Sequence, residues 1–136
     1  ERLSYQINAQ EDCQNILVPK LTITTFVENA CVHGIEAKSF PGWIFVRVYT
    51  EDDALCMEIE DTGGGMDEAE VERIQDRMRN ASLKMLKEKG RVGMVNTCLR
   101  IRMMTEDTAQ FSVESEPGIG TLVSIRLPLN KAIRAD

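Results

Sequence analysis

The spacing of hydrophobic residues predicts three helices along this chain. Apolar residues recur at steps of three and four between positions 21 and 31, and Gly34 stands where a left-handed cap would end that helix. The same period returns over residues 67–89 and 94–104. Asp67, with a glutamate three residues later, has the pattern of a capping box, so we expect the second helix to begin there.

The remaining segments carry the patterns of strands. Apolar and polar residues alternate, or β-branched and aromatic residues gather, in five stretches. These stretches are residues 3–9, 43–49, 55–60, 110–114 and 121–127. Hairpins and helices without a regular βαβ rhythm predict an α+β fold, a two-layer sandwich whose mixed, mostly antiparallel sheet is covered on one face by helices.

Composition and charge narrow the class of protein. The 136 residues are enough for one domain with a real core. The net charge of −6 argues against a nucleic-acid partner, whereas a single nucleotide stays compatible because Mg²⁺ and backbone N–H groups can neutralise its phosphates. No run of the chain is long enough to span a membrane. The chain begins with Glu1 rather than Met, so we expect one piece of a longer protein.

The cysteines argue against a zinc site. They form no C-x-x-C pair, and only one histidine accompanies them. Three of the four lie within apolar patterns, so we expect reduced, buried thiols in a cytosolic setting. The four are Cys13, Cys31, Cys56 and Cys98.

Three polar residues interrupt the apolar surface of the first helix. They are Glu28, Asn29 and His33, and the last two are four residues apart, so they share one helix face. Polar side chains at an apolar seam cost free energy unless a partner satisfies them. Two interpretations follow, a bound ligand or a solvent-edge helix whose asparagine caps a neighbouring loop.

Glycine-containing loops adjoin the predicted elements at three places. Their patterns are Asp61-x-Gly63-x-Gly65, Gly90-x-x-Gly93 and Gly118-x-Gly120-Thr121. Asp61 also stands at a strand end, where a buried carboxylate that accepts from an exocyclic amino group would distinguish adenine from a keto-bearing base. An Asx-turn residue is the alternative interpretation of Asp61.

The order of these features resembles the GHKL superfamily of gyrase-type topoisomerases, a heat-shock chaperone, histidine kinases and MutL-type repair ATPases. Four boxes carry the resemblance: Glu28-Asn29 with His33-Gly34, Asp61-x-Gly63-x-Gly65-Met66, Val92-Gly93-Met94-x-Asn96, and Gly118-x-Gly120-Thr121. Two segments are similar to sensor histidine kinases of the LytS/YesM type: LTITTFVENACVHGIE and RVGMVNTCLRIRM. The resemblance implies a Bergerat ATP-binding fold over residues 1–136.

The resemblance also implies residues on the phosphate side of an ATP site. Asn29 would give its side-chain oxygen to Mg²⁺, an ion that keeps several waters of its own. Glu28 would hold such a water or tune the metal, so Glu28 and Asn29 are the expected catalytic residues. His33 would line the phosphates, while Gly93 and Met94 would offer backbone N–H groups to them at a helix start.

On the adenine side, the resemblance implies that Asp61 binds the amino group of the base. Gly63, Gly65 and Met66 would form the loop whose backbone closes over the base. Thr121 would support both Asp61 and the adenine through its hydroxyl.

A lid over the nucleotide is the third implication, placed at residues 66–92 and expected to be the mobile part. The chain departs from related kinases at Val32, where a lysine or arginine is common, and at Arg91, where a glycine is common. Arg91 would then take over part of the charge neutralisation. Four basic residues of the lid would either reach phosphate or simply be solvated: Lys84, Lys87, Lys89 and Arg91.

The expected function is that of the catalytic domain of a two-component sensor histidine kinase. Hydrolytic relatives carry a glutamate where this chain has Thr25, and a threonine cannot act as a base near neutral pH. The resemblance therefore favours transfer of the γ-phosphoryl group of Mg-ATP to a histidine on a separate helical dimerisation domain, then to a response regulator. His33, the only histidine, lies in the nucleotide site, so the chain lacks the acceptor.

Upstream dimerisation and sensor domains would then lie outside this chain. The parent protein would be dimeric and anchored in the bacterial cell membrane, with this domain in the cytoplasm. Two alternatives remain, a non-catalytic GHKL-like nucleotide-binding regulatory module and an anti-sigma-factor serine kinase.

Overall fold

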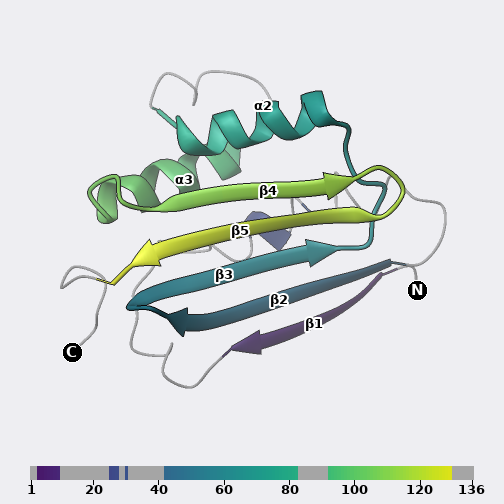
Figure 1. Cartoon of the computed structure of the whole chain (residues 1–136), viewed down its shortest axis with the longest axis horizontal. Coiled ribbons are helices and arrows are strands. Elements are labelled where there is room, and N and C mark those ends of the chain that lie inside the picture. Colours follow the sequence, from purple (N-terminus) through teal and green to yellow (C-terminus); the bar gives the residue numbers. More distant parts are fainter. Residues whose placement is uncertain (1–2, 10–24, 28–29, 31–41, 83–91, 130–136) are drawn as a thin grey trace.

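The computed structural model describes residues 3–9, 25–27, 30, 42–82 and 92–129 (Figure 1). Its strands are β1 (Leu3–Ala9), β2 (Gly42–Glu51), β3 (Ala54–Asp61), β4 (Gln110–Glu116) and β5 (Gly120–Pro128), and its two long helices are α2 (Glu68–Arg79) and α3 (Val92–Met104). All five predicted strands are confirmed, and all but β1 are longer than predicted.

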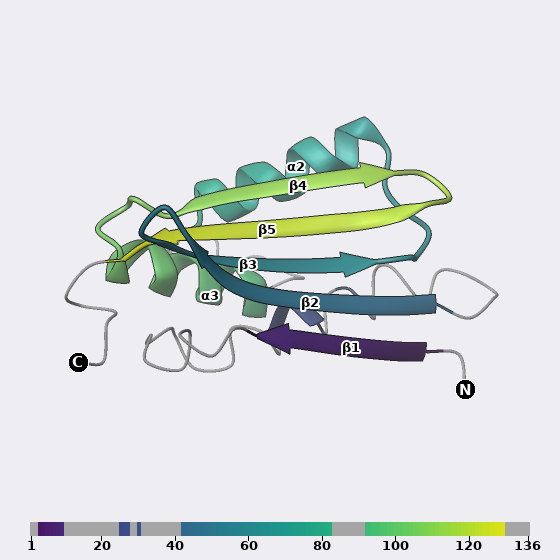
Figure 2. The same cartoon turned by 60° about the horizontal axis from the view of Figure 1, so that its bottom comes forward.

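The strands form one sheet in the order β1-β2-β3-β5-β4. β1 pairs with β2 in parallel, and the other three pairs are antiparallel. Asp52 and Asp53 make the turn between β2 and β3 with φ of 49° and 58°, a conformation that aspartate tolerates better than most residues. Both helices lie on the same face of the sheet (Figures 1 and 2), so the predicted α+β sandwich is confirmed.

One hydrophobic core fills the space between the sheet and the helices. The sheet contributes alternate residues of its strands, such as Ile59 and Ile125, which are almost fully buried. Met78 of α2 and Val95 and Ile101 of α3 have no exposed surface beyond a trace. The core therefore fixes both helices against the sheet.

Helix α2 begins as predicted and ends earlier. Asp67 caps its start, because the Oδ1 atom accepts from the backbone N–H of Glu70 at 2.9 Å. The prediction that this helix continues to Lys89 is wrong, since Asn80 leaves helical geometry and bonds back to Asp76 through both its backbone N–H and its side-chain amide. Ala81 is buried although it lies beyond α2, so the apolar spacing continues past the end of the helix.

Side chains of α2 also cover the free edge of β4, the last strand of the sheet. Gln75 Oε1 accepts from the backbone N–H of Val113 at 3.1 Å, and Arg79 Nε donates to the carbonyl of Phe111 at 3.0 Å. These bonds satisfy backbone groups that an edge strand would otherwise leave open. They tie the second half of α2 to the sheet.

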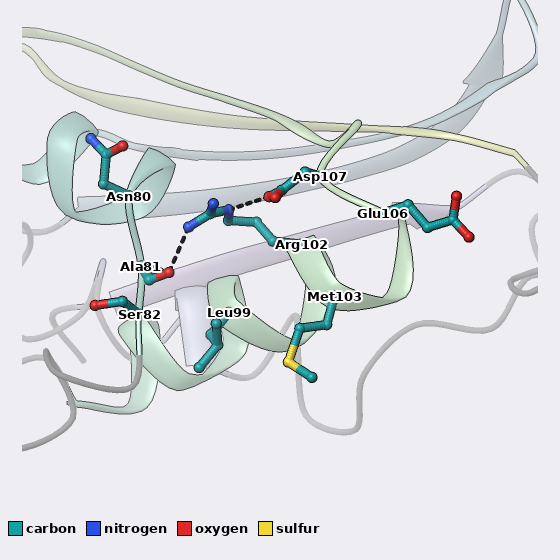
Figure 3. Close-up of a pocket in the computed structure, with 8 residues that line it drawn as sticks. All are labelled: Asn80, Ala81, Ser82, Leu99, Arg102, Met103, Glu106 and Asp107. Carbon is teal, nitrogen blue, oxygen red and sulfur yellow. Dashed lines mark hydrogen bonds and ion pairs between the residues drawn. The ribbon is translucent and has the colours of Figure 1, made fainter.

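Arg102 of α3 holds the chain just after α2 (Figure 3). Its Nη1 donates to the carbonyl of Ala81 at 2.5 Å, and its Nε pairs with Asp107 Oδ1 at 2.7 Å. The pocket drawn there, about 580 Å³, is lined by the ends of both helices and holds none of the predicted site residues. Arg102 is thus a structural link between α2 and α3.

Candidate functional site

Three polar residues interrupt the apolar face of the sheet at one end. Asp61, Thr121 and Ser115 stand side by side on β3, β5 and β4, because Thr121 is the register partner of both of the others. Two residues further along the strands, the same face carries Ile59 and Val123, which belong to the core. We call Asp61, Thr121 and Ser115 the polar row. On this face of the sheet, the hydrophobic core ends at the polar row.

Asp61 is the most buried member of the polar row, at 6% exposure. Its Oδ1 accepts from the backbone N–H of Gly63 at 2.8 Å, which is the geometry of an Asx turn. The Asx-turn interpretation of Asp61 is thus confirmed. Acceptance of a hydrogen bond from an adenine amino group stays a prediction.

The glycine loop after Asp61 is anchored at both ends. At its start, Thr62 exchanges two hydrogen bonds with the backbone of Trp43 in β2, at 3.0 and 2.8 Å. Further along, the carbonyl of Gly64 accepts from the N–H of Gly118 at 2.7 Å in the β4–β5 turn. The N–H of Met66 donates to Ser115 Oγ at 2.8 Å. These bonds fix the loop against β2, β4 and the β4–β5 turn.

Two glycines at this site cannot be replaced without displacing backbone. Gly65 has φ of +70°, and a Cβ there would overlap the carbonyl oxygen of Glu116. Gly120 has φ of +149°, and a Cβ there would overlap the carbonyl oxygen of Asp61. Close backbone approach thus explains why Gly65 and Gly120 are glycines, one in each pattern.

Ser115 is a site residue that the sequence analysis missed. The predicted strand stopped at Glu114, one residue short, whereas β4 runs to Glu116. The alternation that buries Phe111 and Val113 continues to Ser115 and could have placed it on the core face. Its Oγ contacts Met66 N at 2.8 Å, the Gly120 carbonyl at 2.9 Å and Thr121 Oγ1 at 2.8 Å.

A pocket of about 380 Å³ at this end of the sheet lies on the other face from the polar row. Its lining includes Glu60, Leu122 and Glu114, which are cross-strand partners and alternate with the three residues of the polar row along the same strands. This pocket is therefore not the space beside the Asp61 carboxylate.

The predicted phosphate side is described in part. Gly93 lies in the first turn of α3, and Met94 follows with 2% exposure. The first turn of a helix has N–H groups without intrahelical partners, and this one carries no acidic residue. The four basic residues of the predicted lid, which would either reach phosphate or be solvated, lie outside the described residues: Lys84, Lys87, Lys89 and Arg91.

The predicted metal-binding helix runs beside α3. Glu28, Asn29 and His33 lie outside the described residues, but residues 25–27 and Ala30 are helical. Phe26 and Ala30 are buried in the core, at 1% and 7% exposure. Thr97 of α3 donates its hydroxyl to Thr25 Oγ1 at 3.4 Å, which places the two helices in contact.

A metal site is not visible within the part of the chain that the structure describes, where no three His, Cys, Asp or Glu side chains gather. The predicted Mg²⁺ ligand Asn29 is outside that part. Among the same described residues, no helix is both long and apolar enough to cross a membrane.

A family model matches most of this chain. The model of the family described as "Histidine kinase-, DNA gyrase B-, and HSP90-like ATPase" matches residues 19–131. The sensor histidine kinase YesM of Bacillus subtilis (strain 168) is 25% identical over 133 residues, which cover 98% of this chain and 21% of that protein. The sensor histidine kinase YpdA of Escherichia coli (strain K12) is 26% identical over 100 residues, or 74% of this chain and 16% of that protein. This chain therefore spans about a fifth of the length of these relatives.

Solved structures share the fold. The blue-light activated histidine kinase of Erythrobacter litoralis EL346 has a TM-score of 0.66 at 20% identity, covering 95% of this chain and 36% of that one. The catalytic domain of histidine kinase ThkA has a TM-score of 0.60 at 12% identity, covering 93% and 80%. At these identities the likeness extends to the fold alone.

Proposed function

Since this chain belongs to the family of histidine kinase-, DNA gyrase B- and HSP90-like ATPases, we propose that it is the ATP-binding catalytic domain of a two-component sensor histidine kinase. The observation that carries the proposal is the polar row. Its buried Asp61 lies at the end of an apolar sheet face, beside an anchored glycine loop. A buried carboxylate that accepts from the amino group of adenine would leave a keto base unpaired.

The phosphates would extend from the polar row toward the start of α3. The backbone N–H groups of Gly93 and Met94 would bind them, as free N–H groups at helix starts bind anions. Asn29 would hold Mg²⁺, with Glu28 near a metal-bound water and His33 beside the phosphates. When bound, Mg²⁺ supplies charge neutralisation and alignment of the phosphates.

Transfer of phosphate fits this site better than hydrolysis. The position where hydrolytic relatives have a glutamate is Thr25, whose hydroxyl accepts from Thr97 and is no base near neutral pH. The acceptor would be a histidine on a helical dimerisation domain elsewhere in a membrane-anchored, dimeric parent, which then phosphorylates a response regulator. Of the predicted lid at residues 66–92, α2 packs Ile74 and Met78 into the core, and residues 83–91 lie outside the described residues.

Titration calorimetry with a non-hydrolysable ATP analogue, first with Mg²⁺ and then with EDTA, tests the proposal. Asp61→Asn keeps an oxygen for the Gly63 N–H but presents an amide donor, so binding should weaken at least about tenfold. Asp67→Asn is the matched control, since asparagine also caps helices well. No binding by the unmodified chain would overturn the proposal. Binding without transfer to the histidine segment of the parent would favour the regulatory module.

A further inference from the structure

The hydroxyl of Ser115 meets three partners at once. They are the N–H of Met66 at 2.8 Å, the carbonyl of Gly120 at 2.9 Å and the hydroxyl of Thr121 at 2.8 Å. A serine hydroxyl has one proton to donate and two lone pairs that accept. Three contacts therefore fill all of its hydrogen-bonding capacity.

Only one assignment of protons satisfies all three contacts. The N–H of Met66 can only donate, so it occupies one lone pair of Ser115. The carbonyl of Gly120 can only accept, so it takes the Ser115 proton. The contact between the two hydroxyls must then use the proton of Thr121. The Thr121 oxygen is left with lone pairs and no proton for any other group.

We propose that Ser115 is a specificity-determining residue that fixes Thr121 as a hydrogen-bond acceptor beside Asp61. This inference rests on the proposed ATP site. Thr121 and Asp61 are cross-strand neighbours on the same sheet face, so their side chains lie within reach of one ligand group. Two acceptors side by side suit the 6-amino group of a purine, which has two protons. A 6-keto oxygen would meet acceptors only.

Ser115 does not touch the base in this account, so it is a positioning residue that acts through Thr121. Ser115→Ala removes the oxygen that receives the Thr121 proton, and this proton then becomes free to turn toward a keto oxygen. The same change also removes an anchor of the loop at Met66, which would weaken all ligands alike. Discrimination between two purines separates these two effects.

The experiment measures Kd for ADP and for IDP, whose bases carry a 6-amino and a 6-keto group, by calorimetry on the whole chain. Ser115→Ala should lower the ratio of Kd for IDP to Kd for ADP at least fivefold, on the order of one hydrogen bond. Ser112→Ala on the same strand, whose side chain faces away from the core, should leave the ratio unchanged. Thr121→Val should lower the ratio by itself, and adding Ser115→Ala to it should then change nothing further.

The outcomes distinguish the inference from the function on which it rests. The inference is supported if Ser115→Ala lowers the ratio of Kd for IDP to Kd for ADP in the unmodified chain but does not change this ratio in the Thr121→Val variant. Equal weakening of ADP and IDP, with the ratio preserved, would overturn it and leave Ser115 as a loop anchor. If Ser115→Ala does not fold, Thr121→Val with an unchanged ratio overturns it as well. Failure of the unmodified chain to bind either nucleotide would remove the proposed function itself.

Discussion

Gly65 combines an unusual backbone conformation with close packing against another strand. At φ of +70°, alanine costs about 1 kcal/mol or more, and its Cβ would also overlap the carbonyl oxygen of Glu116. Gly118 is the matched control, because its φ is +82° but the space around it is open. Urea unfolding should show that Gly65→Ala loses at least twice as much stability as Gly118→Ala. Equal losses would mean that packing against Glu116 contributes nothing.

Cys98 is a thiol without access to solvent, and burial raises its pKa to about 12. Cys56 is also a buried free thiol, as expected, while Cys13 and Cys31 lie outside the described residues. Because the thiolate is the reactive form, iodoacetamide at pH 8 should label Cys98 at least about 100-fold more slowly in the folded chain than in urea. Mass spectrometry of the Cys98 peptide measures this, and rapid labelling in the folded chain would contradict it.

The raised pKa of Cys98 makes the free energy of unfolding depend on pH. The folded pKa of Cys98 lies above the unfolded value of about 8.5, so between these values the folded chain holds the proton more tightly. The contribution of this thiol to stability is therefore present below about pH 8.5 and is lost as the pH rises toward 12. Cys98→Ala should unfold with a weaker pH dependence in that window.

At the scale of elements, Arg102 joins the end of α2 to the end of α3. Arg102→Met keeps the length of the side chain but leaves the carbonyl of the buried Ala81 without this donor, which should cost about 1–3 kcal/mol in urea unfolding. Arg100→Met, an exposed position on the same helix, should stay within about 0.5 kcal/mol. If the two variants unfold alike, the bond to Ala81 does not contribute to stability.

The elements also show what sequence patterns can and cannot predict. Period alone placed every described strand and α3, because alternation and helical spacing report directly on which face is buried. The end of α2 was misplaced because Ala81 is buried without being helical. The motifs that resemble the GHKL boxes predict Asp61 and Thr121 as site residues, whereas Ser115 becomes a candidate only through the register that sets it opposite Thr121. Register and strand order, including the parallel β1–β2 pair, depend on contacts between distant segments.

At the scale of the whole molecule, the proposed nucleotide site has two halves in different parts of the fold. The base half is the polar row at the ends of β3, β5 and β4, and the phosphate half is the start of α3 with the segment around Asn29. A ligand that binds only the folded state at 100 times its Kd adds about 2.7 kcal/mol, which for a domain of this size raises Tm by roughly 5–10 °C. Mg-ADP should do so in a thermal melt.

Adenosine and Asp61→Asn separate the two halves in the same melt. Adenosine engages the base half alone, so at equal concentration it should raise Tm by less than ADP, and EDTA should reduce the shift with ADP but not that with adenosine. Asp61→Asn should diminish both Tm shifts, because both ligands depend on Asp61 for recognition of the base. A shift with ADP that survives Asp61→Asn unchanged would place binding at the phosphate half alone. The polar row would then stabilise the end of the sheet without recognising a base.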